Sequence, residues 1–94
     1  MLITVIIPCY NEKNTIKKII DKILSLKKIN IQIIVVDDFS SDGTIDILKN
    51  EILNKVDKII FHTKNKGKGA AIKSSISLIR GDVIIIQDAD LEYD

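Results

Sequence analysis

Four short runs of mostly isoleucine and valine alternate along the chain with segments that have helical spacing. The runs cover residues 2–7, 31–36, 58–62 and 82–87, and their length and β-branched composition are typical of strands. Three of them, 2–7, 31–36 and 82–87, are almost continuously apolar. A strand covered on both faces of a parallel sheet needs that pattern. We therefore expect these three to be central strands.

The segments between the strands predict three helices. In the first, apolar residues recur with helical spacing at positions 16, 19, 20, 23 and 24. This spacing predicts an amphipathic helix with Asn14 as its cap. The second helix should run from about 44 to 53, after a turn-forming cluster at 40–43. The third should begin near Gly67 and end at 80–81. The residues that we expect it to pack inward are Ile72, Ile76 and Ile79.

The predicted order is β-α-β-α-β-α-β over one domain, residues 1–94. Such alternation predicts an α/β fold with a Rossmann-like parallel sheet and right-handed crossovers. Three helices cannot fully cover both faces of four strands. We therefore expect an uncovered sheet surface, through which two copies of the chain could form a homodimer.

Composition narrows the classes of function. Ninety-four residues make one small domain, short for a complete multi-substrate enzyme. With 46% hydrophobic and 29% charged residues the chain should be globular. Its net charge of +1 argues against a nucleic-acid partner and against a broad footprint for anionic membranes.

The single cysteine and the first strand bear on localisation. Cys9 has no partner for an internal disulfide, which fits a reducing compartment, and we expect it to be a small buried side chain. The first apolar run lacks a basic leader and ends at Pro8, so neither a signal peptide nor a membrane span is expected. We predict a cytoplasmic location.

Candidate metal ligands follow the fourth strand. The carboxyl ends of parallel strands share one edge of the sheet, where ligands bind in open α/β folds. Asp88 and Asp90 lie there two residues apart, and an extended backbone would send both side chains to the same side. Mg²⁺ and Mn²⁺ prefer such oxygen ligands, with substrate phosphates completing the shell. The pair predicts a divalent metal site.

Other polar residues at this edge have two interpretations each. Asp37 and Asp38 end the second strand and could cap the next helix or accept hydrogen bonds from a ribose hydroxyl or a base N–H. Glu12 could contact ribose or sit in the first turn of a helix. Tyr10 could stack on a base or cover the end of the strand.

The loop after the third strand suggests phosphate binding. Gly67, Lys68 and Gly69 open a helix, which suits close approach of a phosphate to the backbone. A simple loop and cap is an equal alternative, because Ile72 replaces the third glycine of a dinucleotide fingerprint. His62, the only histidine, is interpreted as a structural residue at a strand end, and no nucleophilic triad is predicted.

Four segments together resemble a known family. They are 5–12 (VIIPCYNE), 35–44 (VVDDFSSDGT), 65–71 (NKGKGAA) and 87–90 (QDAD). In this order they look like the successive motifs of family-two inverting glycosyltransferases with the GT-A fold. Within that family they are most similar to dolichyl-phosphate mannose synthase and related polyprenyl-phosphate sugar transferases.

The resemblance implies roles for individual residues. The nucleotide pocket would be lined by Pro8, Tyr10, Glu12, Val36 and Asp38. Lys68 would lie near this pocket. Asp88, Ala89 and Asp90 would match the Asp-x-Asp segment, with Asp90 the direct metal ligand and Asp88 near sugar or ribose as well as metal. Phe39 stands where the family often has glycine.

The resemblance also implies a reaction. The donor would be a nucleoside-diphosphate sugar, GDP-mannose or a UDP-sugar, whose diphosphate is neutralised by Mg²⁺ or Mn²⁺ during inverting transfer of a hexose. The acceptor would be a polyprenyl (dolichyl) phosphate or a saccharide, and membrane association would come only through a lipid acceptor.

Family members continue beyond the Asp-x-Asp motif, with the acceptor site and the general base. We therefore expect residues 1–94 to be the donor-binding portion, truncated after that motif and weakly active or inactive alone. Two alternatives remain: a receiver-like phospho-acceptor domain, and a non-catalytic oligomerisation module.

Overall fold

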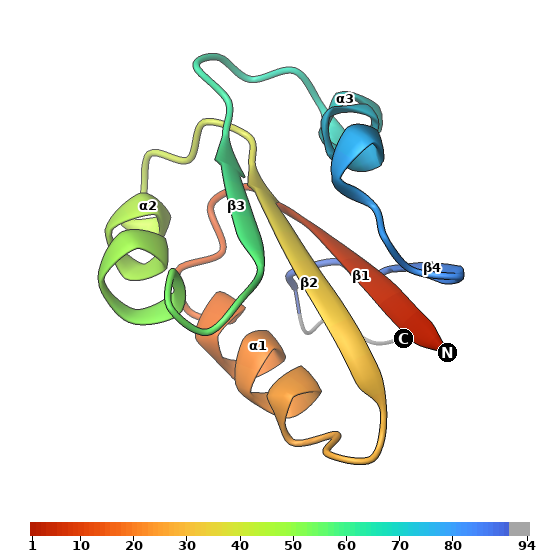
Figure 1. Cartoon of the computed structure of the whole chain (residues 1–94). Coiled ribbons are helices and arrows are strands. Elements are labelled where there is room, and N and C mark those ends of the chain that lie inside the picture. Colours follow the sequence, from red (N-terminus) through yellow and green to blue (C-terminus); the bar gives the residue numbers. More distant parts are fainter. Residues whose placement is uncertain (91–94) are drawn as a thin grey trace.

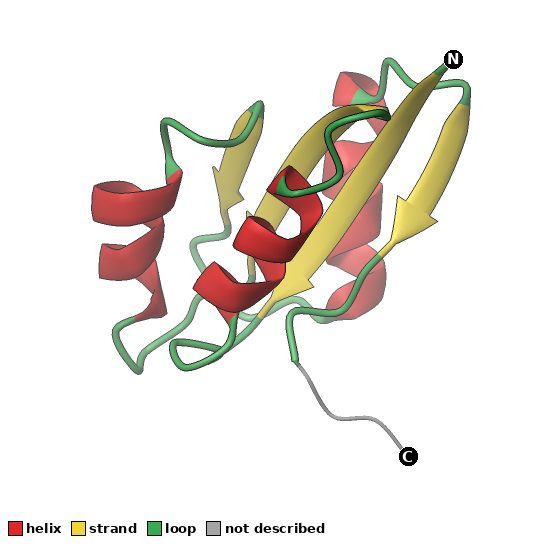
Figure 2. Cartoon of the chain, turned by 90° about the horizontal axis from the view of Figure 1, so that it is seen from below, coloured by secondary structure: helices red, strands yellow, loops and turns green. Residues whose placement is uncertain are grey.

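A computed structural model describes residues 1–90, and residues 91–94 are not described. It contains one four-stranded sheet with helices on both faces (Figures 1 and 2). In chain order the elements are β1 (Leu2–Cys9), α1 (Ile16–Leu24), β2 (Asn30–Asp37), α2 (Thr44–Ile47), the π-helical turn η1 (Leu48–Ile52), β3 (Lys58–Phe61), α3 (Lys68–Ser75), the 3-10 turn η2 (Ile76–Leu78) and β4 (Val83–Ile86). The predicted alternation of strands and helices is confirmed.

All strand pairs are parallel, in the order β3-β2-β1-β4. β1 and β2 pair along their whole lengths, from Leu2 opposite Asn30 to Cys9 opposite Asp37. The chain adds β2 and β3 on one side of β1 and β4 on the other. In open α/β sheets, ligands bind at such a reversal, outside the carboxyl ends of the strands. The crevice above β1 is therefore the expected site.

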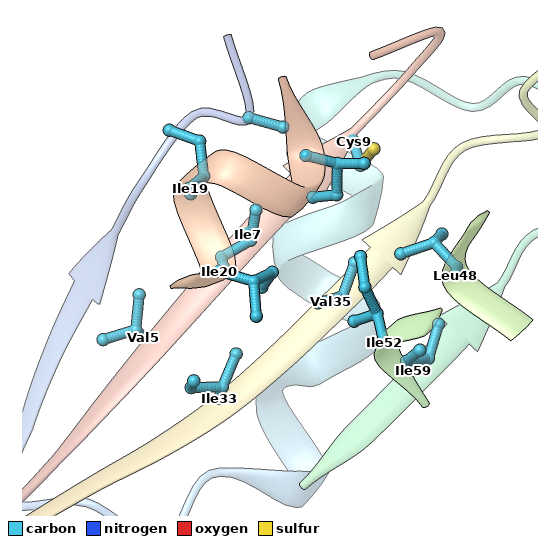
Figure 3. Close-up of a cluster of buried hydrophobic side chains, with 12 residues drawn as sticks. Val5, Ile7, Cys9, Ile19, Ile20, Ile33, Val35, Leu48, Ile52 and Ile59 are labelled. Atoms are coloured by element: carbon cyan, nitrogen blue, oxygen red, sulfur yellow. The ribbon is translucent and has the colours of Figure 1, made fainter. Parts of the chain in front are cut away.

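The larger core lies between the sheet and the helices α1, α2 and η1 (Figure 3). Its strand residues alternate along β1 and β2, because every second side chain of a strand faces the same side. They pack against Ile16, Ile19 and Ile20 of α1 and against Leu48 and Ile52 of η1.

A smaller core lies on the other face of the sheet, under α3 and η2. Ile34 and Val36 of β2 pack there against Ala71, with Leu78 and Ile79 partly buried around them. β1 and β2 are therefore covered on both faces, as predicted. Their continuous apolar sequence reflects this two-sided burial.

β4 differs from its prediction as a central strand. It is one of the two edge strands of the sheet, and all four of its residues are exposed, from 41% at Val83 to 50% at Ile84. Apolar side chains on both faces of a strand show that it can be buried, but they do not specify what covers it. Within residues 1–90, helices cover the neighbouring strands and leave β4 open.

Two helix predictions were also wrong in detail. Ile76 is 59% exposed because the buried face of α3 carries Ala71 and Ser75, and Ile76 lies about 100° further round the helix than Ser75. Asn14 is not the cap of α1. Thr15 occupies that position without a side-chain capping bond, and its hydroxyl lies 2.7 Å from the carbonyl oxygen of Ala89.

The amino ends of the strands are joined by a buried polar network. Thr4 donates to Gln32 Oε1 (2.7 Å), and Gly81 N donates to Thr4 Oγ1 (2.8 Å). Gln32 Nε2 in turn donates to the carbonyl oxygen of Leu78 (2.7 Å). The turn between η2 and β4 is thereby held against β1 and β2. None of the helices within 1–90 has the length and apolar character to cross a membrane.

Candidate functional site

An open cavity lies at the carboxyl edge of the sheet, where the strand order reverses. Its volume is about 140 Å³, smaller than the roughly 300–1,000 Å³ of ordinary ligand pockets. Residues 1–90 therefore form a wall rather than a closed pocket. The lining residues are Pro8, Cys9, Tyr10, Glu12, Asp38, Lys68, Ala71, Asp88, Ala89 and Asp90.

Eight of the nine residues proposed from the sequence line this cavity, all except Val36. Val36 is fully buried in the smaller core, where it packs near Ala71. It can support the wall of the cavity only from behind. The other eight come from four separate segments, which the parallel strands bring to one edge.

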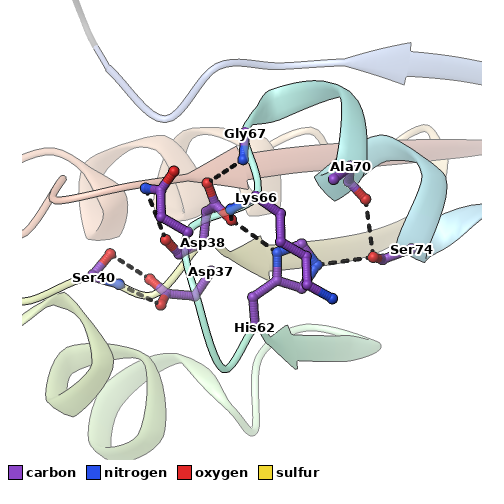
Figure 4. Close-up of polar contacts among 9 residues, drawn as sticks. Asp37, Asp38, Ser40, His62, Lys66, Gly67, Ala70 and Ser74 are labelled. Atoms are coloured by element: carbon purple, nitrogen blue, oxygen red, sulfur yellow. Dashed lines mark hydrogen bonds and ion pairs between the residues drawn. The ribbon is translucent and has the colours of Figure 1, made fainter.

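Asp38 is held by three donors from the β3–α3 segment (Figure 4). Its Oδ1 accepts hydrogen bonds from Lys66 N (2.8 Å) and from His62 Nδ1 (2.9 Å). Its Oδ2 accepts one from Gly67 N (2.8 Å). Burial by itself would raise the pKa of Asp38, but these hydrogen bonds outweigh it and hold the pKa below its usual value.

His62 belongs to this cluster, although its position at a strand end suggested only a structural residue. It is 7% exposed, and its Nε2 lies 2.8 Å from Ser74 Oγ. Ser74 also donates to the carbonyl oxygen of Ala70 (2.9 Å). The imidazole thus links the end of β2 to α3. No sequence signal links His62 to Asp38, because 24 residues separate them.

Asp37 has a structural role. Its side chain is fully buried and accepts hydrogen bonds from Ser40 N (3.0 Å) and Ser40 Oγ (2.6 Å). Ser40 Oγ accepts a further bond from Asn11 N (2.9 Å). Asp37 therefore closes the turn after β2 and joins it to the loop after β1, while its neighbour Asp38 lines the cavity.

Asp42 caps α2. It accepts hydrogen bonds from Thr44 N (3.0 Å) and Lys13 N (3.3 Å). Burial opposes its ionisation, yet the bonds from Thr44 and Lys13 lower the pKa of its carboxyl. The prediction that Asp37 or Asp38 caps α2 is therefore wrong, and a third aspartate contacts the start of that helix.

Glu12 lies in the loop before α1 and not in its first turn, which contains no acidic residue, and the ribose contact stays a prediction. It lines the cavity, and its Oε2 lies 3.0 Å from the hydroxyl of Thr15 at the start of α1. Thr15 also contacts the carbonyl oxygen of Ala89. The loop that carries Glu12 is thereby tied to the segment that follows β4.

Lys68 and Asp88 face each other at the cavity mouth, with Nζ 2.6 Å from Oδ1. Asp88 and Asp90 line the same cavity. No group of three or more metal-binding side chains occurs among residues 1–90. Two carboxylates nevertheless fit a Mg²⁺ or Mn²⁺ ion whose remaining ligands are phosphate oxygens and water.

Cys9 lines the cavity but is not reactive. It is 2% exposed, as predicted. Burial raises the pKa of its thiol, and the nearby carboxylates of Asp37, Glu12 and Asp42 raise it further. The thiolate needed for nucleophilic chemistry is therefore scarce at neutral pH.

Comparison with known proteins places this geometry in a family. The model of the family "Glycosyl transferase family 2" matches residues 4–94. The chain belongs to glycosyl transferase family 2. This membership confirms the resemblance of the motifs and speaks against a receiver-like domain.

Two curated relatives of this glycosyltransferase chain have dolichol phosphate or undecaprenyl phosphate in their names. It is 35% identical over 94 residues to a dolichol-phosphate mannosyltransferase of Pyrococcus furiosus, covering 99% of this chain and 27% of the relative. It is 28% identical over 96 residues to an undecaprenyl-phosphate 4-deoxy-4-formamido-L-arabinose transferase of Aeromonas hydrophila, covering 97% and 29% respectively. The chain thus spans little more than a quarter of the length of these relatives.

Solved glycosyltransferase structures confirm the GT-A fold. A mannosyltransferase of Pyrobaculum calidifontis in complex with GDP-Man and Mn²⁺ matches with a TM-score of 0.79 and 29% identity, over 94% of this chain and 27% of that one. A glucosyl-3-phosphoglycerate synthase of Mycobacterium tuberculosis with Mn²⁺ and UDP matches with a TM-score of 0.74 and 27% identity, over 94% and 33%. The two complexes contain different bases, so the family does not decide the base.

Proposed function

We propose that residues 1–94 form the donor-binding region of a metal-dependent glycosyltransferase that takes a nucleoside-diphosphate sugar. The observation that carries the proposal is the separation of the carboxylates within one cavity. Asp38 follows β2 whereas Asp88 and Asp90 follow β4, and β1 lies between these strands. Two strand spacings of about 4.8 Å separate the two groups by about 10 Å.

This separation matches the two ends of a nucleotide. The base and ribose would lie at Asp38, Glu12 and Tyr10, where hydrogen-bond acceptors and an aromatic ring are available. The diphosphate would lie at the other end, next to the amino group of Lys68, which reaches Asp88.

Asp88 and Asp90 would hold Mn²⁺ or Mg²⁺ together with the diphosphate. When bound, the ion would neutralise the negative charge that develops on the nucleoside-diphosphate leaving group. Lys68 would add a second positive charge. Its ion pair with Asp88 already brings an ammonium group to this end of the cavity.

The acceptor is proposed from the names of the relatives. A polyprenyl phosphate fits the dolichol-phosphate and undecaprenyl-phosphate transferases that the chain matches. We name no catalytic base among residues 1–90. The chain alone should bind the donor and transfer sugar slowly or not at all, and any contact with a membrane would be through the lipid acceptor.

Thermal unfolding in the presence of GDP-mannose, UDP-glucose and UDP-N-acetylglucosamine, with and without Mn²⁺, tests the proposal. A donor at 100 times its Kd should add about 2.7 kcal/mol to the free energy of unfolding. Asp90→Ala should remove the Mn²⁺-dependent part of the shift, and Glu12→Ala should weaken binding with or without metal. Asp46→Ala in α2, outside the cavity, is the matched control. If no donor raises the melting temperature, the proposal is wrong.

A further inference from the structure

The hydrogen bonds to Asp38 leave one acceptor position. A carboxylate has about four acceptor sites, two on each oxygen. The Oδ1 atom already accepts from Lys66 N and His62 Nδ1, and Oδ2 accepts from Gly67 N (Figure 4). Within residues 1–90, therefore, only Oδ2 keeps a site for a ligand.

The three donors are fixed in place. His62 is buried between Asp38 and Ser74, and the other two donors are backbone N–H groups. Gly67 has φ +91°, a conformation that glycine adopts readily. The side chain of Asp38 is also only 8% exposed, so it has little room to rotate. The one vacant acceptor site on Oδ2 therefore keeps its position when a ligand binds.

We propose that Asp38 accepts one hydrogen bond from the base, so that this site selects uracil over guanine, with His62 as the specificity-determining residue. The inference rests on the proposed nucleotide-sugar site. Uracil presents a single ring donor, N3–H, between two carbonyl groups. Guanine presents N1–H and the 2-amino group side by side, and a carboxylate pairs with both only if each oxygen has a vacant site.

One of the two hydrogen-bond donors of guanine would therefore have no acceptor on Asp38. One of its two donors could reach Oδ2, while the other would face Oδ1, whose sites are filled by His62 and Lys66. A donor enclosed without a partner weakens binding substantially, as in other sites that discriminate by unpaired polar groups. Uracil leaves no donor unpaired.

Calorimetric titration of the 94-residue chain with UDP, CDP, GDP and IDP, in the presence of Mn²⁺, tests the inference. UDP should bind at least about tenfold more tightly than CDP, which lacks N3–H, and than GDP, which corresponds to about 1.4 kcal/mol. IDP should bind more tightly than GDP, because hypoxanthine lacks the 2-amino group that guanine would leave without an acceptor. This comparison needs no variant.

Two substitutions at position 62 test the role of the imidazole. His62→Leu removes the donor to Oδ1 and should make GDP bind about tenfold more tightly than IDP. His62→Asn keeps an N–H donor near the place of Nδ1 and should preserve the order found for the native chain. Circular dichroism checks that each variant folds.

The outcomes separate the two proposals. The base preference is overturned if the native chain binds GDP as tightly as UDP, or binds GDP tenfold more tightly than IDP. The proposed nucleotide site would stand in both cases. If none of the four nucleotides binds with Mn²⁺, the proposed function fails and the base preference fails with it. If His62→Leu folds and leaves the order unchanged, His62 does not determine specificity.

Discussion

The Nζ atom of Lys68 lies 2.6 Å from Oδ1 of Asp88, which joins the first residue of α3 to the loop after β4. Both side chains are about half exposed, and exposed ion pairs contribute little to stability. The pair matters because Asp88 is also a proposed metal ligand. A metal ion and the lysine would compete for the same carboxylate.

Lys68→Met should therefore have opposite effects on two ligands. Mn²⁺ alone should bind a few-fold more tightly, because its competitor is gone. UDP or GDP should bind several-fold more weakly, since a positive charge near the diphosphate is lost. Paramagnetic resonance of free Mn²⁺ and calorimetry measure the two constants. Lys73→Met, an exposed lysine later in α3, should change neither, and a parallel loss of both affinities would contradict the competition.

Asp38 should make the stability of the chain depend on pH in the acid range. Its pKa is lowered in the folded state, so its stabilising contribution is fully present above the unfolded value of about 3.9. The contribution disappears as the pH falls below that value and through the folded pKa. Urea unfolding between pH 6 and pH 2 should show a steeper loss for the native chain than for Asp38→Asn. Parallel curves would contradict the pKa assignment.

Phe39 has φ +67°, a left-handed conformation that costs roughly 1–2 kcal/mol for a residue with a β-carbon. We expect Phe39→Gly to be more stable than Phe39→Ala by about 1 kcal/mol, because only glycine relieves this strain. At Lys73, inside α3, the order should be reversed, with alanine more stable than glycine by about 1 kcal/mol. Chemical denaturation of the four variants gives both differences. The same order at the two positions would rule out strain at Phe39.

Gly81 lies against the backbone of β1. A β-carbon there would overlap Thr4 Oγ1 and lie 2.6 Å from Thr4 N, so Gly81→Ala should destabilise the chain by about 1–3 kcal/mol. Gly69→Ala is the matched control, since its β-carbon would meet nothing within 4 Å and alanine favours the helix by up to about 1 kcal/mol. Equal effects of the two changes on urea midpoints would refute the close approach.

The exposed edge strand β4 should promote self-association. Its four apolar residues are 41–50% exposed, and an open edge offers unpaired backbone groups to another strand. The purified chain should sediment as a dimer or larger species, and Ile84→Lys should shift it towards the monomer. Leu53→Lys, an exposed apolar position outside the sheet, should have no effect. A monomeric native chain would contradict this prediction.

The sequence predicted the strands and helices well because burial imposes a local period on the chain. Because β1 and β2 are covered on both faces, they need apolar residues at consecutive positions, and this pattern can be recognised from the sequence alone. The same pattern misassigned β4, since the composition of a strand does not say which neighbours it has. Strand order is a property of the whole sheet.

The sequence by itself determined the α/β class, the family motifs and the set of carboxylates at one edge, because these depend on residue type and on the direction of parallel strands. Only the tertiary structure decided what each carboxylate does. Asp37 and Asp38 are adjacent in the chain, yet one closes a turn with Ser40 and the other meets His62. Hydrogen-bond partners are determined by distance in space, and no spacing along the chain encodes a contact between residues 38 and 62.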